Sequence, residues 1–249
     1  MAQHGPLAGS VAFVTGGSRG IGAAIARHLA RAGADVALTY NTNAALADAV
    51  ADEITALGRR ALTFKTPTAD RESVATAVTS AAGELGGLDI LVNNAGLGRG
   101  GHIADVTDAD LDELLDVNVR AVFIGTRAAL PVMRDGGRVI TIGSNLAEKV
   151  FQPGYALYAM TKSALLGFTK GLAHDVAPRR ITANLVQPGS TDTDMNPATG
   201  PAAEAQRGRS ALGYYGSADD IAGAVTFLAS PAAGHITGTT LTIDGGQLA

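Results

Sequence analysis

The stretch "VAFVTGGSRGIGAAIARHLARAGA", residues 11–34, decides the fold. It begins with five residues typical of a buried strand, passes through a glycine-rich turn, and continues in an alanine-rich helical pattern. Glycine permits a tight turn, lets backbone N–H groups approach a pyrophosphate, and leaves room for a helix against a sheet. The positive end of that helix favours an anion at the same point. The stretch therefore predicts a dinucleotide site, with a plain glycine-rich turn as the alternative.

The rest of the chain repeats this alternation of short apolar runs and longer amphipathic ones. We expect strands at 11–15, 36–40, 61–64, 89–94, 138–144, 181–188 and 240–244. We expect helices near 20–32, 44–57, 71–85, 108–134, 155–177 and 217–229. Continuous apolar strands are buried on both faces, and helical crossovers imply parallel pairing. The pattern predicts one α/β domain over residues 1–249, with a doubly wound parallel sheet of about seven strands and ligands beyond their carboxyl ends.

The composition excludes several other classes of function. The formal net charge is −4 and the basic residues are scattered, so we expect no nucleic-acid partner. The chain has no cysteine, and its five histidines show no ligand spacing, so we expect no metal ion. No apolar run approaches the length that crosses a bilayer, and the N-terminal residues lack the pattern of a secretion signal. We therefore expect a cytoplasmic protein without a membrane partner.

The end of the second expected strand, "LTYNTN" at 38–43, bears on the choice of cofactor. An NAD site places an acid here, which accepts from the ribose 2′-hydroxyl. This chain instead offers Tyr40, Asn41 and Thr42, with Arg19 in the glycine-rich turn. Hydroxyl, amide and guanidinium donors suit a 2′-phosphate, which an acid would repel. The sequence therefore predicts NADP (NADPH), with a merely solvated Arg19 as the alternative.

The stretch "SNLAEKVFQPGYALYAMTK", residues 144–162, contains two tyrosines and a lysine. Tyr158 and Lys162 are spaced to share one helix face, whereas the residue four past Tyr155 is Ala159. Tyr158 is therefore the candidate for proton transfer. A phenol loses its proton near pH 10, and a lysine at about 4 Å would lower that pKa by roughly three units.

Taken together, the motifs resemble the classical short-chain dehydrogenase/reductases over residues 8–246. The matching residues are "TGGSRGIG" (15–22), "NNAG" (93–96), "DVNVRA" (116–121), Ser144, "YAMTK" (158–162) and "QPGSTDTDM" (187–195). The resemblance implies a Rossmann-like fold. The chain departs from many relatives after the third strand, where Pro67 and Thr68 stand in place of an acidic or amide residue near the adenine.

The resemblance also implies a role for each matching residue. Ser144 would hydrogen-bond the substrate oxygen, Tyr158 would exchange its proton, and Lys162 would hold the nicotinamide ribose and tune Tyr158. Asn118 matches a residue that holds a water for proton relay, with an internal polar residue as the alternative. The expected cofactor contacts are Gly16, Ser18, Arg19, Gly20, Ile21, Gly22, Tyr40, Asn41, Thr42, Asn94, Ala95, Gly96, Tyr158, Lys162, Pro188, Gly189, Thr191 and Thr193.

The substrate wall is expected from the loop after Ser144 and from the residues after the sixth strand. The candidates are Leu146, Phe151, Tyr155, His102 and Met195. For Phe151, simple packing of the loop is the alternative. Residues 190–214, here called the lid segment, are rich in small residues and prolines, and in relatives they form a mobile lid.

The leading interpretation is an NADP-dependent carbonyl reductase or alcohol dehydrogenase, assembled as a homotetramer as relatives are. Residues 186–201 also resemble a bacterial branch of the family that binds a cyclic dinucleotide and regulates biofilm dispersal. Other relatives reduce 3-oxoacyl chains on acyl carrier protein, which they dock through basic residues on helices that flank the entrance. The matching positions, Arg134 and His174, are each followed by an aspartate. This predicts weak docking of an acidic carrier and favours free, hydrophobic ketones or 3-oxo esters.

Overall fold

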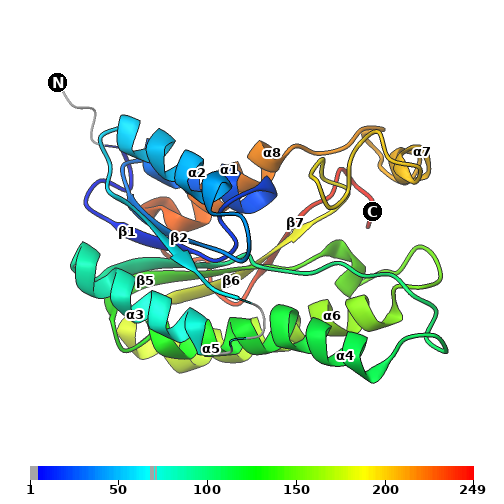
Figure 1. The fold of residues 1–249 in the computed structure, drawn as a ribbon, viewed down its shortest axis with the longest axis horizontal. Coiled ribbons are helices and arrows are strands. Elements are labelled where there is room, and N and C mark those ends of the chain that lie inside the picture. The colour runs from blue at the N-terminus through cyan, green and yellow to red at the C-terminus, as the bar shows by residue number, and fades with distance from the viewer. Residues whose placement is uncertain (1–4, 68–69, 71) are drawn as a thin grey trace.

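A seven-stranded sheet forms the centre of the structure, a computed structural model that describes residues 5–67, 70 and 72–249. The strand order is β3-β2-β1-β4-β5-β6-β7, and every neighbouring pair is parallel. The strands are β1 (Val11–Val14), β2 (Asp35–Tyr40), β3 (Ala61–Lys65), β4 (Leu88–Asn93), β5 (Met133–Ile142), β6 (Thr182–Pro188) and β7 (Thr240–Ile243). The predicted Rossmann-like, doubly wound sheet is confirmed (Figure 1).

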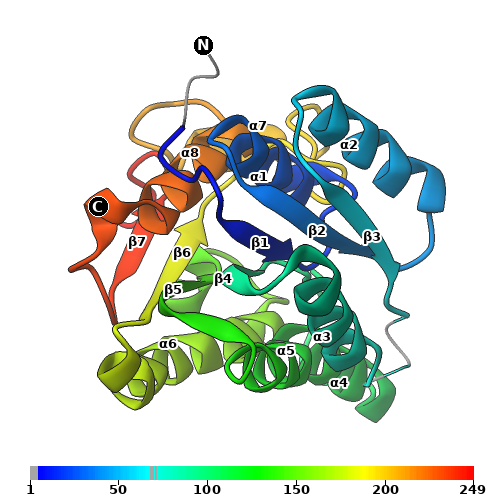
Figure 2. The ribbon, with the colours of Figure 1, turned by 90° about the vertical axis from the view of Figure 1, so that its left-hand side faces the viewer.

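Helices cover both faces of this sheet (Figures 1 and 2). One layer holds α1 (Gly20–Arg31), α2 (Ala44–Ala56) and α8 (Ala218–Ala229), and the other holds α3 (Ser73–Leu85), α4 (Asp108–Leu115), α5 (Ala121–Ala129) and α6 (Ala156–Val176). Successive residues of a strand point to opposite faces. Val14 accordingly joins the core under α1 and α8, while Phe13 joins the core under α3 and α6. This double burial explains the continuous apolar strands.

The expected helix over 108–134 differs most from the prediction. It consists of α4, a π-helical turn over Asp116–Arg120, and α5, which already ends at Ala129. Residues 133 and 134 belong to β5. A single π turn leaves the apolar pattern on either side intact, so periodicity alone does not reveal it.

The lid segment contains a short helix, α7 (Ala203–Arg207), although its sequence predicts no simple helix. In Figure 1 this helix lies apart from both layers, at one end of the sheet. Short 3-10 turns occur at Asn145–Ala147, Ala177–Arg179 and Pro231–Ala233. No helix among the described residues combines the length and apolarity needed to cross a bilayer. Within the same part of the chain, no three acidic or histidine side chains gather as metal ligands would.

Candidate active site

A cavity of about 590 Å³ opens beyond the carboxyl ends of the strands. The order of the sheet reverses between β1 and β4, which is where doubly wound sheets bind their ligands. The wall comprises the glycine-rich turn, the loops after β2, β4, β5 and β6, and part of the lid segment. Nearly all the predicted site residues line it. The exceptions are Thr42, His102 and Asn118.

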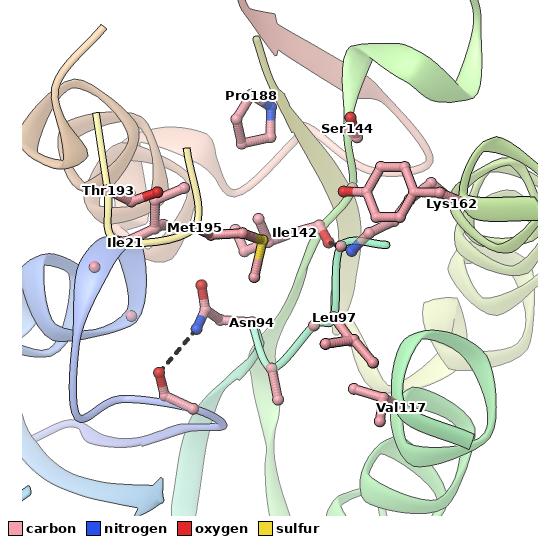
Figure 3. A pocket seen from close by; sticks show the side chains of 18 of the residues that line it. Ile21, Asn94, Leu97, Val117, Ile142, Ser144, Lys162, Pro188, Thr193 and Met195 are labelled. Carbon is pink, nitrogen blue, oxygen red and sulfur yellow. Dashed lines mark hydrogen bonds between the residues drawn. The ribbon is translucent and has the colours of Figure 1, made fainter. Parts of the chain in front are cut away.

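The glycine-rich turn is packed so closely at Gly22 that no side chain fits there. A Cβ built on Gly22 would lie 2.2 Å from the carbonyl oxygen of Gly16 and 2.4 Å from Nδ2 of Asn94. The Asn94 amide donates to the carbonyl oxygens of Thr15 and Gly16, at 2.9 and 3.1 Å. Figure 3 shows Asn94 beside this turn and marks one of its hydrogen bonds. Oγ1 of Thr39 accepts from the N–H of Gly16 at 2.9 Å. The turn is therefore fixed from two neighbouring strands.

The N-terminus of α1 begins in this turn. Its N-cap residue, Arg19, makes no capping hydrogen bond with its side chain, so the first N–H groups of the helix can serve an anion. The Arg19 guanidinium instead lies 3.7 Å from the carboxylate of Asp194 on the lid segment. Sequence reasoning missed this ion pair, because the partners are remote in the chain.

Donors line the corner where a ribose 2′-substituent would lie. Tyr40 and Asn41 belong to the cavity wall, while Thr42 lies outside it. Asp35 begins β2 at the opposite edge of the sheet, where its carboxylate accepts from Nε of Arg60 at 2.8 Å. The structure therefore places no carboxylate from β2 in this corner. Of the two residues expected near the adenine, Pro67 lines the cavity and Thr68 lies outside the described residues.

Ser144, Tyr158 and Lys162 come together between the end of β5 and the start of α6. Ser144 is 8 % exposed, its hydroxyl accepts from the N–H of Leu146 at 3.2 Å, and its side chain acts on the pKa of Tyr158. Nζ of Lys162 lies 5.9 Å from the centre of the Tyr158 ring and donates to the carbonyl oxygen of Ile142 at 3.1 Å. Figure 3 shows Ser144 and Lys162 reaching the same cavity from β5 and α6. A Cβ on Gly96 would lie 3.3 Å from this Nζ, so glycine keeps the space free.

Burial governs the protonation of this cluster. Loss of solvent raises the pKa of the Tyr158 hydroxyl above its usual range, and the Ser144 side chain opposes that rise. Burial also lowers the pKa of Lys162 to about 8. The expected lowering of the Tyr158 pKa by Lys162 is therefore not what the structure shows. The cause is that desolvation acts on both groups, while the ammonium is directed to the Ile142 carbonyl.

Asn118 lies on the π-helical turn and is fully buried. Its Oδ1 accepts from the N–H of Leu97 at 2.8 Å, and its Nδ2 donates to the Leu97 carbonyl oxygen at 2.9 Å. The same Nδ2 donates to Oγ1 of Thr161 at 3.1 Å. Both amide protons are thus used inside the protein. The Asn118 side chain fixes the loop after β4 against α6 and does not face the cavity.

The substrate wall contains most of its predicted members. Leu146, Phe151, Tyr155 and Met195 line the cavity. Met195 is 58 % exposed and projects from the lid segment into the cavity, as Figure 3 shows. A Cβ on Gly98 would lie 3.1 Å from its sulfur, so Gly98 makes room for it. His102 lies outside the wall and turns its Nδ1 to the N–H of Ala104.

Sequence reasoning missed a hydrogen-bonded series of five side chains, here called the amide chain. Asn145 donates to Gln247 at 2.7 Å, and Gln247 donates to Ser190 at 2.9 Å. Ser190 donates to Gln206 at 2.6 Å, and Gln206 donates to Asn196 at 2.9 Å. All five line the cavity, and they join the end of β5 to α7. Only the position of Asn145 beside Ser144 hints at this role in the sequence.

The two positions matched to carrier docking lie away from the cavity mouth of this chain. Arg134 is on β5 rather than on a helix, and its guanidinium donates to the carboxylate of Asp89 near the start of β4. His174 lies in the last turn of α6. Both positions are at the amino-terminal edge of the sheet, because α5 and α6 run back from the carboxyl ends. The expectation that they flank the entrance within one chain is therefore wrong.

Comparisons with known proteins agree with this geometry. A family model described as enoyl-(acyl carrier protein) reductase matches residues 16–247. The cyclic-di-GMP-binding biofilm dispersal mediator protein of Escherichia coli K12 is 40% identical over 241 residues, covering 97% of this chain and 98% of that protein. The 3-oxoacyl-acyl-carrier-protein reductase FabG of the same organism is 40% identical over 247 residues, covering 96% and 97%.

Among solved structures, a short chain dehydrogenase from Burkholderia cenocepacia J2315, in complex with NADP, is 54% identical. The TM-score is 0.97, and the match covers 98% of this chain and 100% of that one. The similarity to this protein, in sequence and in fold, therefore extends along almost the whole chain. The protein belongs to the short-chain dehydrogenase/reductase family of oxidoreductases.

Proposed function

We propose that the protein is an NADPH-dependent reductase that converts a ketone or 3-oxo ester to the secondary alcohol, reversibly. One observation carries the proposal: Ser144 and Tyr158 lie beside the buried Lys162, in the cavity that the glycine-rich turn also lines. A pure binding protein needs no such cluster. The NADP complex of the Burkholderia cenocepacia relative supports the choice of cofactor.

The residues of the cavity fit such a cofactor. The uncapped N-terminus of α1 and the side-chain-free turn at Gly16 and Gly22 would hold the pyrophosphate. Arg19 and Asn41 would hold the 2′-phosphate, because the corner offers donors and no carboxylate from β2. Lys162 would bind the nicotinamide ribose. The remaining predicted contacts from 188 to 193 lie at the end of β6 and on the turn that follows it. When bound, NADPH supplies the hydride.

The chain's own residues would orient the substrate and supply the proton. The Ser144 hydroxyl would hydrogen-bond the carbonyl oxygen and hold it next to Tyr158. Tyr158 would donate its proton to that oxygen, and its raised pKa keeps it protonated for this purpose. The Lys162 ammonium would stabilise the phenolate that remains. Because the Asn118 amide is engaged with Leu97, any relay water at the π-helical turn would be held by backbone groups.

The lid segment would close the substrate side of the cavity, with Leu146, Phe151, Tyr155 and Met195 as its apolar surface. These side chains favour free, hydrophobic ketones or 3-oxo esters. Two rival functions come from the relatives, one named as a cyclic-di-GMP-binding mediator and one as a 3-oxoacyl-acyl-carrier-protein reductase. One set of measurements separates all three functions.

The test follows NADPH oxidation over a panel of ketones, 3-oxo esters and a carrier-bound 3-oxoacyl chain, with NADH in parallel. We expect NADPH to give the higher kcat/KM, and Asn41→Asp to shift the preference towards NADH. We expect free 3-oxo esters to exceed the carrier-bound chain. Binding of cyclic-di-GMP is measured by calorimetry on the same preparation. Tight binding of that ligand, without oxidation of NADPH by any carbonyl compound, would establish the regulatory alternative instead.

We also propose that the protein assembles as a homotetramer. An apolar groove of about 320 Å³ runs between the α4–α5 region and α6 and is lined by Leu115, Val119, Phe123 and Phe168, among others. Phe123 is 51 % exposed, and Phe227 on α8 is 46 % exposed. A second copy that paired these helices would cover both side chains. Light scattering should give four times the chain mass of 25.1 kDa, and a mass of one chain would contradict the proposal.

A further inference from the structure

Four arginines line the cavity, and one of them differs from the others in its partners. Three form an ion pair with at least one carboxylate: Arg19, Arg99 and Arg120. The fourth is Arg209, which follows α7 in the lid segment. Within residues 5–67, 70 and 72–249, no carboxylate oxygen lies within 4.0 Å of its guanidinium nitrogens. Its positive charge is therefore not neutralised by a direct partner in the described chain.

The guanidinium of Arg209 is nevertheless held in place. It lies 5.3 Å from the centre of the Phe151 ring, and its Nη2 donates to Oε1 of Gln152 at 2.8 Å. Arginine has five N–H donors, and this is the one that meets an acceptor among the described residues. The neighbouring ring and the single hydrogen bond hold the group in place and leave the other donors available.

The position of Arg209 assigns it to the substrate side of the cavity. Phe151 and Gln152 belong to the loop that follows Ser144, and both line the cavity with Arg209. The proposed 2′-phosphate corner is formed instead by Arg19, in the turn after β1, and by Tyr40 and Asn41, at the end of β2. Nζ of Lys149 lies 5.4 Å from the centre of the same Phe151 ring but does not line the cavity. Lys149 therefore adds a second positive charge near the Phe151 ring.

We propose that Arg209 forms a subsite for an anionic oxygen group on the substrate, while Ser144 and Tyr158 receive the carbonyl. A planar guanidinium with free donors matches a carboxylate or a phosphate through two parallel hydrogen bonds. The group is either the carboxylate of a keto acid or the phosphate of a free phosphopantetheine thioester. The proposal deepens the proposed function and rests on it for turnover, but binding at Arg209 is measurable without turnover.

The turnover test compares substrates that differ only in the anionic group. Levulinate is paired with methyl levulinate, and acetoacetyl-phosphopantetheine is paired with acetoacetyl-pantetheine, each with saturating NADPH. In one pair, the anionic member should have a kcat/KM at least about tenfold higher, equivalent to about 1.4 kcal/mol. The pair that shows the preference identifies the source of the anion. The preference should weaken as salt rises.

Variants assign the preference to Arg209. Arg209→Met should bring the ratio of kcat/KM, anionic member over neutral member, close to one. The neutral member should keep most of its kcat/KM. Arg209→Lys keeps the charge but loses the planar fork, so it should restore only part of the ratio. Lys149→Met is the matched control, because it removes one charge from the same ring outside the cavity wall. It should leave the ratio nearly unchanged.

Calorimetry on protein saturated with oxidised NADP tests the subsite without chemistry. Valerate should bind more tightly than valeramide, or phosphopantetheine more tightly than pantetheine, and Arg209→Met should remove the difference. Arg209-dependent binding without reduction of any ketone would keep the subsite and overturn the proposed function. Reduction of ketones with no anion preference in either pair, or with a preference that survives Arg209→Met, would overturn the subsite and keep the function.

Discussion

The two ends of the cavity differ in whether backbone or side chains form their walls. At the cofactor end, formed by the turn at residues 15–22 and the loop at 93–96, the backbone is packed so closely that a Cβ added at Gly22 would overlap Gly16. At the substrate end, formed by residues 144–155 and the lid segment, long side chains meet other side chains through the amide chain and Arg209. The first end cannot accept added volume. The second can change its polarity without moving the backbone, so specificity should reside there.

The largest difference in kcat is expected between variants of two tyrosines that lie where the two ends meet. Tyr158→Phe should lower kcat by about 10²- to 10⁴-fold, because it removes the proposed general acid. Tyr155→Phe, three residues earlier on the substrate wall, should lower kcat much less. The dissociation constant of NADPH, measured by fluorescence titration, should stay nearly constant in both variants. Equal losses of kcat in the two variants would mean that the assignment of Tyr158 is incorrect.

A pH titration of stability tests how completely the catalytic cluster is buried. The native pKa of Lys162 is about 8, whereas an unfolded lysine has a pKa of about 10.4. Between these values the unfolded chain binds the proton and the native protein does not, so this group makes stability rise with pH. The rise should amount to at most about 3 kcal/mol.

Chemical unfolding without added cofactor, compared between the wild type and Lys162→Met, isolates this effect. The free energy of unfolding of the wild type, relative to the variant, should increase from about pH 8 to about pH 10.4. It should be flat below that window, because both states then hold the proton. A relative stability that stays constant across the window would show that Lys162 is solvated in the native protein.

Added volume at the cofactor end should be costly. Gly22→Ala places a Cβ 2.2 Å from the Gly16 carbonyl oxygen, so the turn must shift. We expect the free energy of unfolding to fall by about 1–3 kcal/mol and NADPH binding to weaken. Gly223→Ala in α8 is the control, because nothing lies within 4 Å of its added Cβ. That variant should be as stable as the wild type or slightly more so. Normal NADPH affinity in Gly22→Ala would refute the rigid cofactor end.

The smallest effect is expected in the amide chain. Gln206→Ala removes its hydrogen bonds to Ser190 and Asn196, and each such bond contributes about 0.5–1.5 kcal/mol. The KM for a ketone should rise by up to about tenfold, while the dissociation constant of NADPH is unchanged. Gln206→Glu keeps the accepting oxygen and should lie in between. Glu204→Ala, on the exposed side of α7, serves as the control. Weakened NADPH binding in Gln206→Ala would show that the two ends are coupled.

The same contrast explains what the sequence could reveal. The sheet and the glycine-rich turn depend on local sequence patterns. The strands, most helices and the position of Gly22 at the turn could therefore be predicted. The amide chain could not be predicted, because Asn145 and Gln247 are 102 residues apart and neither belongs to a local motif. The protonation of Tyr158 was also beyond the sequence, since spacing shows that a lysine is near but not where its ammonium points.

Because Gln247 is translated late, the substrate end is completed late during synthesis of the chain. The glycine-rich turn and the loop at 93–96, which would hold the pyrophosphate, are complete once residue 96 has been made, whereas Gln247, which is 6 % exposed and bonded to Asn145 and Ser190, follows about 150 residues later. On the ribosome, the part of the fold around β1 to β4 can therefore form first, as N-terminal regions generally do. The pocket acquires its final wall only when the residues after β7 emerge. A nascent chain should accordingly form the turn that would hold the pyrophosphate before it can discriminate among substrates.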